Sequence, residues 1–226
     1  MRIKVCGITS IDQMHQLGDL GVQFAGMIFY HPSPRFVLKH ALKAADVKAE
    51  KVKPYKIGVF VNSKYDEVMN TVDAFGLDMV QLHGDETPYQ CEKISNYIQV
   101  IKAFRFADGD HVEWMTKDYY NCCDMFMFDT GVTEKKDATQ YGGTGRKFNW
   151  NRLKGLAVNK PFFLSGGIEP TDAENVKAFM RDKVAKDLFA VDINSRFETS
   201  PGVKDMQLVK KFIDELNAQE CDASKA

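Results

Sequence analysis

Short apolar runs alternate with longer amphipathic stretches along almost the whole chain. The runs are nearly continuous in apolar, β-branched and aromatic residues, and most are followed at once by Gly, Asn, Asp or Ser. This pattern is typical of strands that are buried on both faces of a parallel sheet. The predicted strands are Ile3–Cys6, Val22–Tyr30, Tyr55–Val61, Met79–Leu82, Gln99–Phe104, Met125–Phe128, Pro161–Leu164 and Leu188–Val191.

Stretches with helical periodicity lie between these runs. Ser10 stands before an apolar stripe, and Thr87 precedes Pro88 at the start of another such stretch. Ser and Thr side chains accept hydrogen bonds from the free N–H groups at a helix start, where proline is also tolerated. The predicted helices are Ser10–Leu20, Ser63–Phe75, Thr87–Tyr97, Asp172–Met180 and Lys204–Leu216.

The predicted strands recur about every 27 residues, which is room for one strand, one loop and one helix. Alternating strands and helices form a parallel sheet, and eight such units favour a closed (β/α)8 TIM barrel of the α/β class. An open, doubly wound sheet is the alternative, but no GxGxxG motif follows the first strand. We expect one catalytic barrel domain over residues 1–218 and a loose tail over residues 219–226.

Composition and charge narrow the possible partners. The chain has 226 residues, 44% of them hydrophobic, and 30 Lys and Arg against 31 Asp and Glu give a net charge of −1. This balance lacks the basic surface with which proteins bind nucleic acids or anionic membranes. No apolar run reaches the roughly 18 residues that a membrane span requires. We therefore expect neither a nucleic-acid nor a membrane partner.

The five cysteines indicate a reducing compartment. Their number is odd, their spacing forms no disulfide framework, and the N-terminus has no secretory signal pattern. No CxxC or HxxxH spacing suggests a zinc site, so no metal is expected. The sequence thus predicts a cytoplasmic protein with free thiols.

Polar residues placed directly after the strands are the candidates for chemistry. In a (β/α)8 barrel the active site lies where the strands end and the βα loops begin. These positions are occupied by Cys6, Arg35, Asn62, His83, Asp129, Ser165, Asp192 and Asn194.

Glycine-rich segments after the sixth and seventh strands predict a phosphate site. Gly142–Gly145 and Ser165–Gly167 let backbone N–H groups approach an anion, and Asn194–Ser195 stands at the next strand end. Barrels commonly bind phosphate with the loops after strands 7 and 8. The alternative is that these segments are only tight turns. We expect a phosphorylated small molecule as ligand.

Eight motifs in order along the chain resemble the phosphoribosylanthranilate isomerase family of tryptophan biosynthesis. Together they span nearly the whole chain and fall at the predicted strand ends. They are Lys4–Thr9, Gly58–Asn62, Val80–Glu86, Phe128–Thr130, Gly142–Gly145, Leu164–Ile168, Val191–Ser195 and Pro201–Asp205.

The resemblance implies an Amadori rearrangement of N-(5-phospho-β-D-ribosyl)anthranilate to 1-(2-carboxyphenylamino)-1-deoxy-D-ribulose 5-phosphate. It makes Cys6 the general base, Asp129 the general acid and Arg35 the partner of the anthranilate carboxylate. A protonated Schiff base is its own electron sink, so no cofactor is needed. We expect a phosphosugar substrate and a monomer or homodimer. The phosphate-binding residues are expected to be Gly143, Gly145, Ser165, Gly166, Gly167, Asn194 and Ser195.

Each role has a plainer alternative. Cys6 could be a core thiol, Asp129 a loop cap and Arg35 a solvated surface residue. For Cys6 to act as a base its thiol pKa should fall toward neutrality, and Lys4 or a bound cation could lower it. Asp129 must hold a proton when needed, which burial favours.

Other polar positions are given lesser roles. His83 and Asp192 are expected to shape the pocket rather than to react. Arg196 stands where the family usually has glycine, and we expect it to point to solvent. The polar stretch Gly131–Tyr141 is a candidate lid.

Other functions fit the sequence less well. A ribulose-phosphate-type epimerase needs metal-ligating His and Asp residues at several strand ends, where only His83 qualifies. An indole-glycerol-phosphate synthase needs strand-end lysines that the first two strands lack. A catalytically inactive phosphate-binding barrel is disfavoured because Cys6 and Asp129 are both present.

Overall fold

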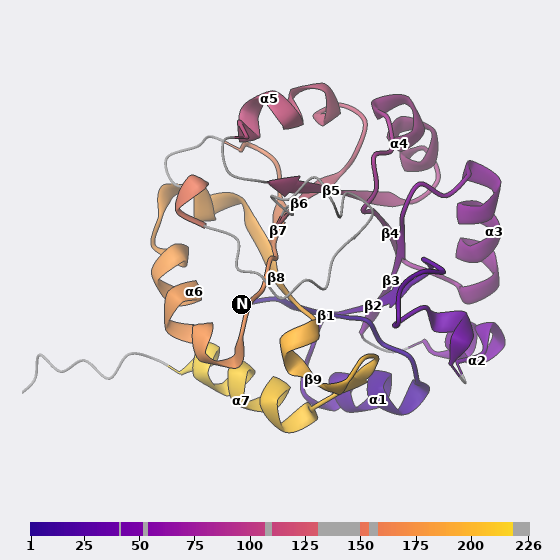
Figure 1. Ribbon diagram of the computed structural model, residues 1–226, viewed down its shortest axis with the longest axis horizontal. Coiled ribbons are helices and arrows are strands. Elements are labelled where there is room, and N and C mark those ends of the chain that lie inside the picture. The colour runs from indigo at the N-terminus through magenta and orange to yellow at the C-terminus, as the bar shows by residue number, and fades with distance from the viewer. Residues whose placement is uncertain (41, 52–53, 107–109, 131–149, 154–157, 219–226) are drawn as a thin grey trace, which may run out of the picture.

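Eight parallel strands close into a barrel in their order along the chain, with the last strand paired to the first. The computed structural model describes residues 1–40, 42–51, 54–106, 110–130, 150–153 and 158–218. Figure 1 shows the helices as a ring outside the barrel. The strands are β1 (Ile3–Cys6), β2 (Phe24–Ile28), β3 (Tyr55–Phe60), β4 (Met79–Leu82), β5 (Gln99–Phe106), β6 (Met125–Thr130), β7 (Phe162–Leu164) and β8 (Leu188–Ile193). The (β/α)8 prediction is therefore confirmed, and the open-sheet alternative is wrong.

All five predicted helices are present, with ends shifted by a few residues. Two short helices, α2 and α5, were not predicted, because six and five residues are too few to display helical periodicity. The α-helices are α1 (Ile11–Asp19), α2 (Ala44–Ala49), α3 (Tyr65–Phe75), α4 (Pro88–Ser95), α5 (Val112–Thr116), α6 (Ala173–Met180) and α7 (Met206–Asn217). The 3₁₀ turns are η1 (Val37–Lys39), η2 (Lys117–Tyr119), η4 (Trp150–Arg152), η5 (Pro170–Asp172), η6 (Lys183–Asp187) and η7 (Ser195–Phe197).

The helix starts follow local capping chemistry. Ser10 accepts a hydrogen bond from the backbone N–H of Gln13, and Thr87 forms a reciprocal capping box with Gln90. The last helix begins later than predicted. Asp205 is its N-cap, so Lys204 lies outside the helix. Within the described residues, no helix is long and apolar enough to cross a membrane.

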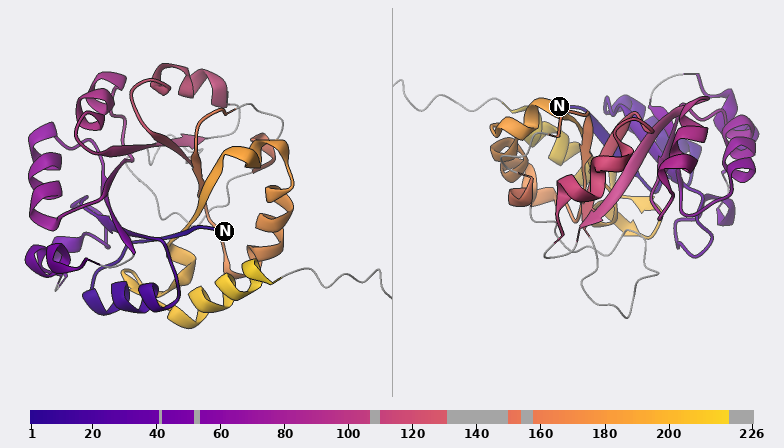
Figure 2. Two further views of the ribbon diagram at one scale, coloured as in Figure 1. Left: turned by 180° about the vertical axis from the view of Figure 1, so that it is seen from behind. Right: turned by 90° about the horizontal axis from the view of Figure 1, so that it is seen from above.

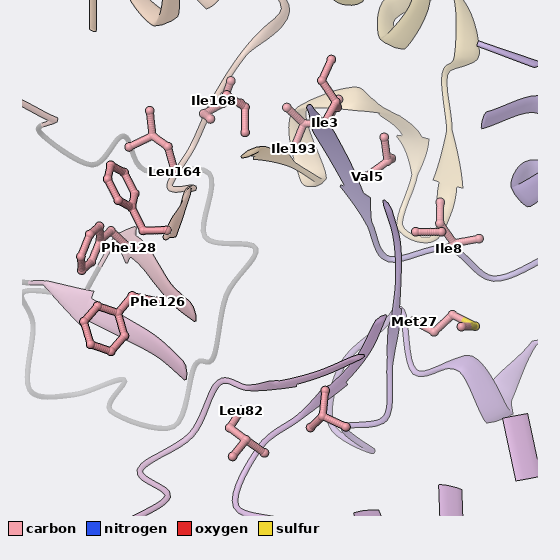
Figure 3. Packing of buried hydrophobic residues seen from close by; sticks show 14 of the residues in the cluster. Ile3, Val5, Ile8, Met27, Leu82, Phe126, Phe128, Leu164, Ile168 and Ile193 are labelled. Carbon is pink, nitrogen blue, oxygen red and sulfur yellow. The ribbon is translucent and has the colours of Figure 1, made fainter. Parts of the chain in front are cut away.

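Side chains alternate in direction along each strand, so the buried ones are divided between two cores. Side chains such as Ile3 and Val5 pack in the layer between the barrel and its helices (Figure 3). A smaller cluster fills the barrel itself: Phe24, Ile57, Ala103, Ile101, Met125, Met127, Phe163 and Ala190. Because successive residues of a strand point to opposite faces, Lys4 and Cys6 of β1 point into the barrel.

A small antiparallel hairpin follows β8 and was not predicted. It consists of β9 (Glu198–Ser200) and β10 (Val203–Lys204) and turns at Gly202, whose φ of +87° suits glycine. Thr9 and Gln13, which follow β1, both donate hydrogen bonds to the carbonyl of Gly202. The hairpin is therefore anchored at the carboxyl end of the barrel (Figure 2).

Candidate active site

Cys6 is the last residue of β1 and is buried at the carboxyl end of the barrel. Gly26 on the neighbouring strand makes room for it. A Cβ atom at Gly26 would lie 2.8 Å from Sγ of Cys6 and 3.2 Å from Cε of Lys4. The backbone then turns away at Gly7, whose φ is +81°, and the N–H groups of Gly7 and Ile8 both donate to the Gly26 carbonyl. The thiol is thus held by packing on β1 and β2.

The charge environment of Cys6 differs from the expected one. Burial raises the pKa of the Cys6 thiol, Lys4 and Lys204 lower it, and the carboxylate of Asp192 raises it. Burial outweighs the two cations, so the pKa lies above its ordinary value rather than falling toward neutrality. The sequence-based expectation on this point is wrong because it left out desolvation inside the barrel.

Gly26→Ala is expected to displace the Cys6 sulfur and to lower kcat by about tenfold or more, since small misplacements of reacting groups are costly. Steady-state kinetics on the substrate proposed below measure the effect. Gly21→Ala is the control: its Cβ meets nothing within 4 Å, but its φ of +71° makes the change strained. It should cost stability without lowering kcat. Equal kcat for the Gly26→Ala and wild-type enzymes would contradict close packing at the thiol.

A row of polar side chains runs inside the barrel from β1 to β7. Lys4 is fully buried, and its Nζ donates to Oδ1 of Asp192 at 2.8 Å. The other oxygen of Asp192 accepts a hydrogen bond from Oγ of Ser165 at 3.0 Å. Asp192 therefore joins the neighbourhood of Cys6 to the loop after β7, as a residue that organises the pocket would.

Asp129 lies near the end of β6 and is buried against His83. Oδ2 of Asp129 lies 3.1 Å from Nε2 of His83, at an angle that does not make an aligned hydrogen bond. The amide of Gln81 lies 2.8 Å from Nδ1 of the same imidazole. His83 therefore borders the carboxyl group that is expected to act as the acid.

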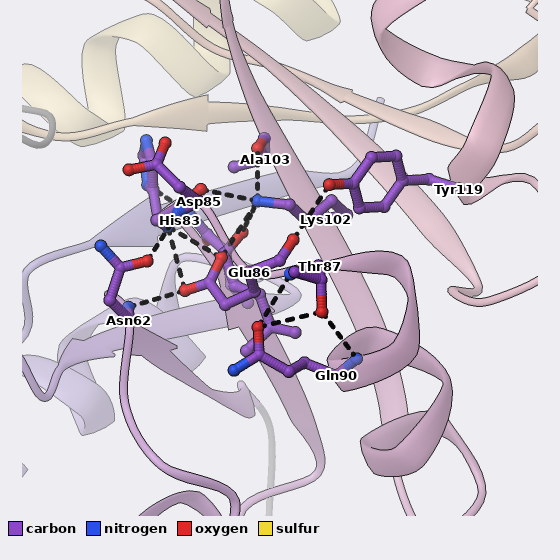
Figure 4. A network of polar contacts seen from close by, with 12 residues as sticks. Asn62, His83, Asp85, Glu86, Thr87, Gln90, Lys102, Ala103 and Tyr119 are labelled. Carbon is purple, nitrogen blue, oxygen red and sulfur yellow. Dashed lines mark hydrogen bonds and ion pairs between the residues drawn. The ribbon is translucent and has the colours of Figure 1, made fainter.

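A buried ion pair fixes the loop that carries His83 (Figure 4). Nζ of Lys102 contacts Oε2 of Glu86 at 3.0 Å and the Gly84 carbonyl at 2.8 Å. Glu86 also accepts hydrogen bonds from the backbone N–H groups of Asn62 and Gly84. Since both charges are satisfied, the pair orders the loops after β3 and β4 together.

Arg35 is buried, so the solvated-surface alternative is wrong. Its Nε and Nη2 donate to the carboxylate of Glu198 at distances from 2.6 to 3.0 Å. Nζ of Lys204 donates to the same carboxylate at 2.7 Å and to Oδ1 of Asn194 at 2.8 Å. These four side chains meet over Gly7, where a Cβ would lie 2.8 Å from Cδ of Arg35.

The charges of this cluster shift one another's pKa values. Burial alone would raise the pKa of Glu198, but Arg35 and Lys204 more than offset it, so the pKa lies below its ordinary value. Burial lowers the pKa of Lys204, and the attraction of Glu198 only partly restores it. Glu198 is thus held as a carboxylate that orients the Arg35 guanidinium.

The loops after β7 and β8 are the part of the predicted phosphate site that the structure describes. Gly166 and Gly167 have φ values of +98° and +68°, which glycine alone adopts readily. Asn194 precedes Ser195, the first residue of η7. Arg196 is half exposed, and its Nε lies 3.5 Å from Oε1 of Glu169. The predicted phosphate residues Gly143 and Gly145, and the candidate lid Gly131–Tyr141, lie outside the described residues.

The structure thus brings most predicted site residues to one end of the barrel and adds four that sequence reasoning missed. Cys6 ends its strand, Asp129 and Asp192 lie one residue before the ends of theirs, and Ser165 and Asn194 directly follow strands. The missed residues are the partners Gln81, Lys102, Glu198 and Lys204. Gln81 could have been found, because it stands two residues before His83 on the same strand face.

The chain matches a known family over almost its whole length. Residues 3–215 match the family model for N-(5′-phosphoribosyl)anthranilate (PRA) isomerase. A protein of Parabacteroides distasonis named N-(5′-phosphoribosyl)anthranilate isomerase is 36% identical over 217 residues, which cover 96% of this chain and 93% of that protein.

Solved structures agree with this match. The phosphoribosyl anthranilate isomerase of Thermotoga maritima superposes with a TM-score of 0.77 at 30% identity, covering 96% of this chain and 98% of that one. A phosphoribosyl anthranilate isomerase in complex with reduced 1-(o-carboxyphenylamino)-1-deoxyribulose 5-phosphate has a TM-score of 0.72 at 26% identity, with the same coverage.

Proposed function

Because the chain belongs to the N-(5′-phosphoribosyl)anthranilate isomerase family of tryptophan biosynthesis, we propose that its general base is Cys6 and its general acid Asp129. The substrate is N-(5-phospho-β-D-ribosyl)anthranilate, and the product is 1-(2-carboxyphenylamino)-1-deoxy-D-ribulose 5-phosphate. A family member that binds the reduced form of this product supports the choice of ligand.

The positions of Cys6 and Asp129 are the observation that supports these roles most. Both are buried near the carboxyl ends of strands that belong to one closed barrel. Cys6 is on β1 and Asp129 is on β6. Around the closed barrel these two strands are separated by β7 and β8 in one direction and by β2 to β5 in the other. A ribose bound at this end of the barrel can therefore face the thiol and the carboxyl group from different sides.

The reaction needs only proton transfers. Asp129 protonates the furanose ring oxygen, the C1–O bond breaks, and the aldose opens to a protonated Schiff base. Cys6, as the thiolate, then takes the proton from C2 to give an enolamine. The enolamine gains a proton at C1 while the C2 hydroxyl loses one, which leaves the ketone. No atoms are gained or lost, so substrate and product are isomers.

The two ends of the substrate fit the charges around this centre. The phosphate would bind at the backbone of Gly166, Gly167 and Ser195. The Gly142–Gly145 segment is proposed to contribute further backbone N–H groups. The anthranilate carboxylate would contact Arg35, which Glu198 holds from the other side. Such an arrangement keeps a guanidinium oriented toward an anionic ligand.

Arg35→Lys is expected to raise the KM by about tenfold, because a point charge cannot reproduce the planar guanidinium fork. Steady-state kinetics measure the KM, and calorimetry compares the binding of the reduced product analogue with that of an analogue without the carboxylate. The analogue without a carboxylate should bind equally weakly to both proteins. A variant that still distinguishes the two analogues as fully as the wild type does would assign the carboxylate to another residue.

Growth provides the test of the proposed function. A bacterium that requires tryptophan because it lacks its own isomerase should grow without tryptophan when it expresses this chain. Cys6→Ala is the matched control and should not restore growth. Failure of the folded, expressed wild-type chain to restore growth would contradict the proposal.

Several further expectations remain predictions. We propose that the enzyme works without cofactor or metal, because the Schiff base itself accepts the electrons that the C2 proton leaves behind. A cytoplasmic location fits a biosynthetic isomerase whose described cysteines are free thiols. Sedimentation analysis decides between monomer and homodimer.

A further inference from the structure

Lys4 is a lysine with no exposed surface, placed inside the barrel two residues before Cys6 on the same face of β1. Lysine is almost never fully buried unless its charge is paired. The ammonium group donates to Oδ1 of Asp192 at 2.8 Å, and it lies near enough to the Cys6 thiol for each group to shift the pKa of the other. Gly26 faces both Lys4 and Cys6 without a side chain, so nothing from β2 separates them.

We propose that Lys4 is a positioning residue of this isomerase: its buried ammonium stabilises the thiolate form of Cys6 that takes the C2 proton, relative to the neutral thiol, and Asp192 moderates this attraction. The proposal rests on the assignment of Cys6 as the base. In this proposal the Lys4–Asp192 pair sets how readily Cys6 loses its proton and so how much thiolate is present.

Among the described residues, three charged groups face Cys6. Lys4 from β1 and Lys204 from β10 favour the thiolate, and Asp192 from β8 opposes it. Lys204 is also held by Glu198 and Asn194, which draw its ammonium toward the hairpin. Lys4 has the larger effect on the thiol, and both cations are buried, so solvent screens neither strongly.

The charge on Lys4 stays fixed while the charge on sulfur changes. Burial alone would lower the pKa of Lys4, but Asp192 and Cys6 outweigh it, so the pKa lies above its ordinary value and the ammonium remains protonated. When the thiolate takes the proton from C2, sulfur becomes neutral and Lys4 keeps its ion pair with Asp192. When the thiol gives up its proton again, the same ammonium stabilises the anion that returns.

The test is the pH dependence of Cys6 alkylation by iodoacetamide, followed by mass spectrometry of the Cys6 peptide so that other thiols do not interfere. Lys4→Met should raise the midpoint of alkylation by about one pH unit or more, because a close cation has been lost. Asp192→Asn should move the midpoint in the opposite direction. A purely structural role for the pair would not move the midpoint in opposite directions.

Two variants serve as controls: one keeps the positive charge at position 4, and the other removes a different buried lysine. Lys4→Arg keeps the charge and should hold the midpoint closer to that of the wild type than Lys4→Met does. Lys56→Met removes a buried lysine whose ammonium contacts carbonyls at the end of α2, and it should leave the midpoint unchanged. Circular dichroism establishes which variants are folded.

The limb of the kcat/KM profile that rises with pH should follow the same shifts. The proposal would be overturned if these midpoints stayed unchanged, or moved in the same direction, in folded Lys4→Met and Asp192→Asn proteins. If Cys6 is too enclosed to be alkylated, the shift of this limb decides alone. A Cys6→Ala enzyme with full activity would instead refute the role of Cys6, whatever Lys4 does to the thiol.

Discussion

Replacing Cys6 with alanine is expected to lower kcat by roughly 10²–10⁴-fold, the usual contribution of one acid–base group. The fold and substrate binding should remain nearly intact, because removing one sulfur from this pocket disturbs no hydrogen-bond ladder. Steady-state kinetics with freshly prepared phosphoribosylanthranilate measure the loss. Cys91→Ala is the matched control, since Cys91 is also a buried thiol but belongs to α4.

More than half of wild-type activity in Cys6→Ala would remove Cys6 from the mechanism. The pH dependence adds an independent check. Because burial holds the pKa of Cys6 above its ordinary value, the thiolate is the minor form at neutral pH and increases as pH rises. We expect kcat/KM to increase about tenfold per pH unit below that pKa where thiolate concentration limits the reaction. The Cys6→Ala enzyme should lack this dependence.

Asp129→Asn is expected to lower kcat by a similar factor, roughly 10²–10⁴-fold, because an amide cannot supply the proton that opens the ring. The change keeps the shape of the side chain next to His83, so the reduced product analogue should still bind. Calorimetry of analogue binding, beside turnover on the substrate, separates the two effects. Asp85→Asn is the control, because the Asp85 carboxylate is exposed and pairs with Arg105.

Loss of analogue binding together with unfolding in Asp129→Asn would identify Asp129 as a structural residue. The acid would then have to be sought elsewhere in the pocket. A second informative result is turnover close to wild type, which would show that another group opens the ring.

The eight strands could be predicted because most of their residues are buried, so each strand is nearly continuous in apolar residues. β1 and β4 have the predicted bounds, whereas β5, β6 and β8 each extend two residues further than predicted, and the first added residue of each is charged. Those added residues include Arg105, Asp129 and Asp192, which pair in the barrel although they are polar. Helix α2 and the β9–β10 hairpin were missed because short elements stabilised by tertiary contacts leave little periodicity.

The candidate residues at the site could be found from their places after strands, but their partners could not. Arg35 and Glu198 are 163 residues apart in sequence, and only closure of the barrel brings them together. The direction of the Cys6 pKa was also misjudged. The sequence showed the neighbouring cation of Lys4, whereas the stronger effect is burial, which depends on the complete barrel.

The most direct measurement follows the fluorescence of the substrate's anthranilate group, which should decay when the wild-type chain is added to freshly prepared phosphoribosylanthranilate. The rate of decay should exceed the rate of spontaneous substrate hydrolysis and should increase in proportion to the enzyme concentration. Mass spectrometry should find a product with the mass of the substrate. Decay no faster than hydrolysis at any enzyme concentration, or release of free anthranilate in place of the isomer, would contradict an acid–base isomerase built on Cys6 and Asp129.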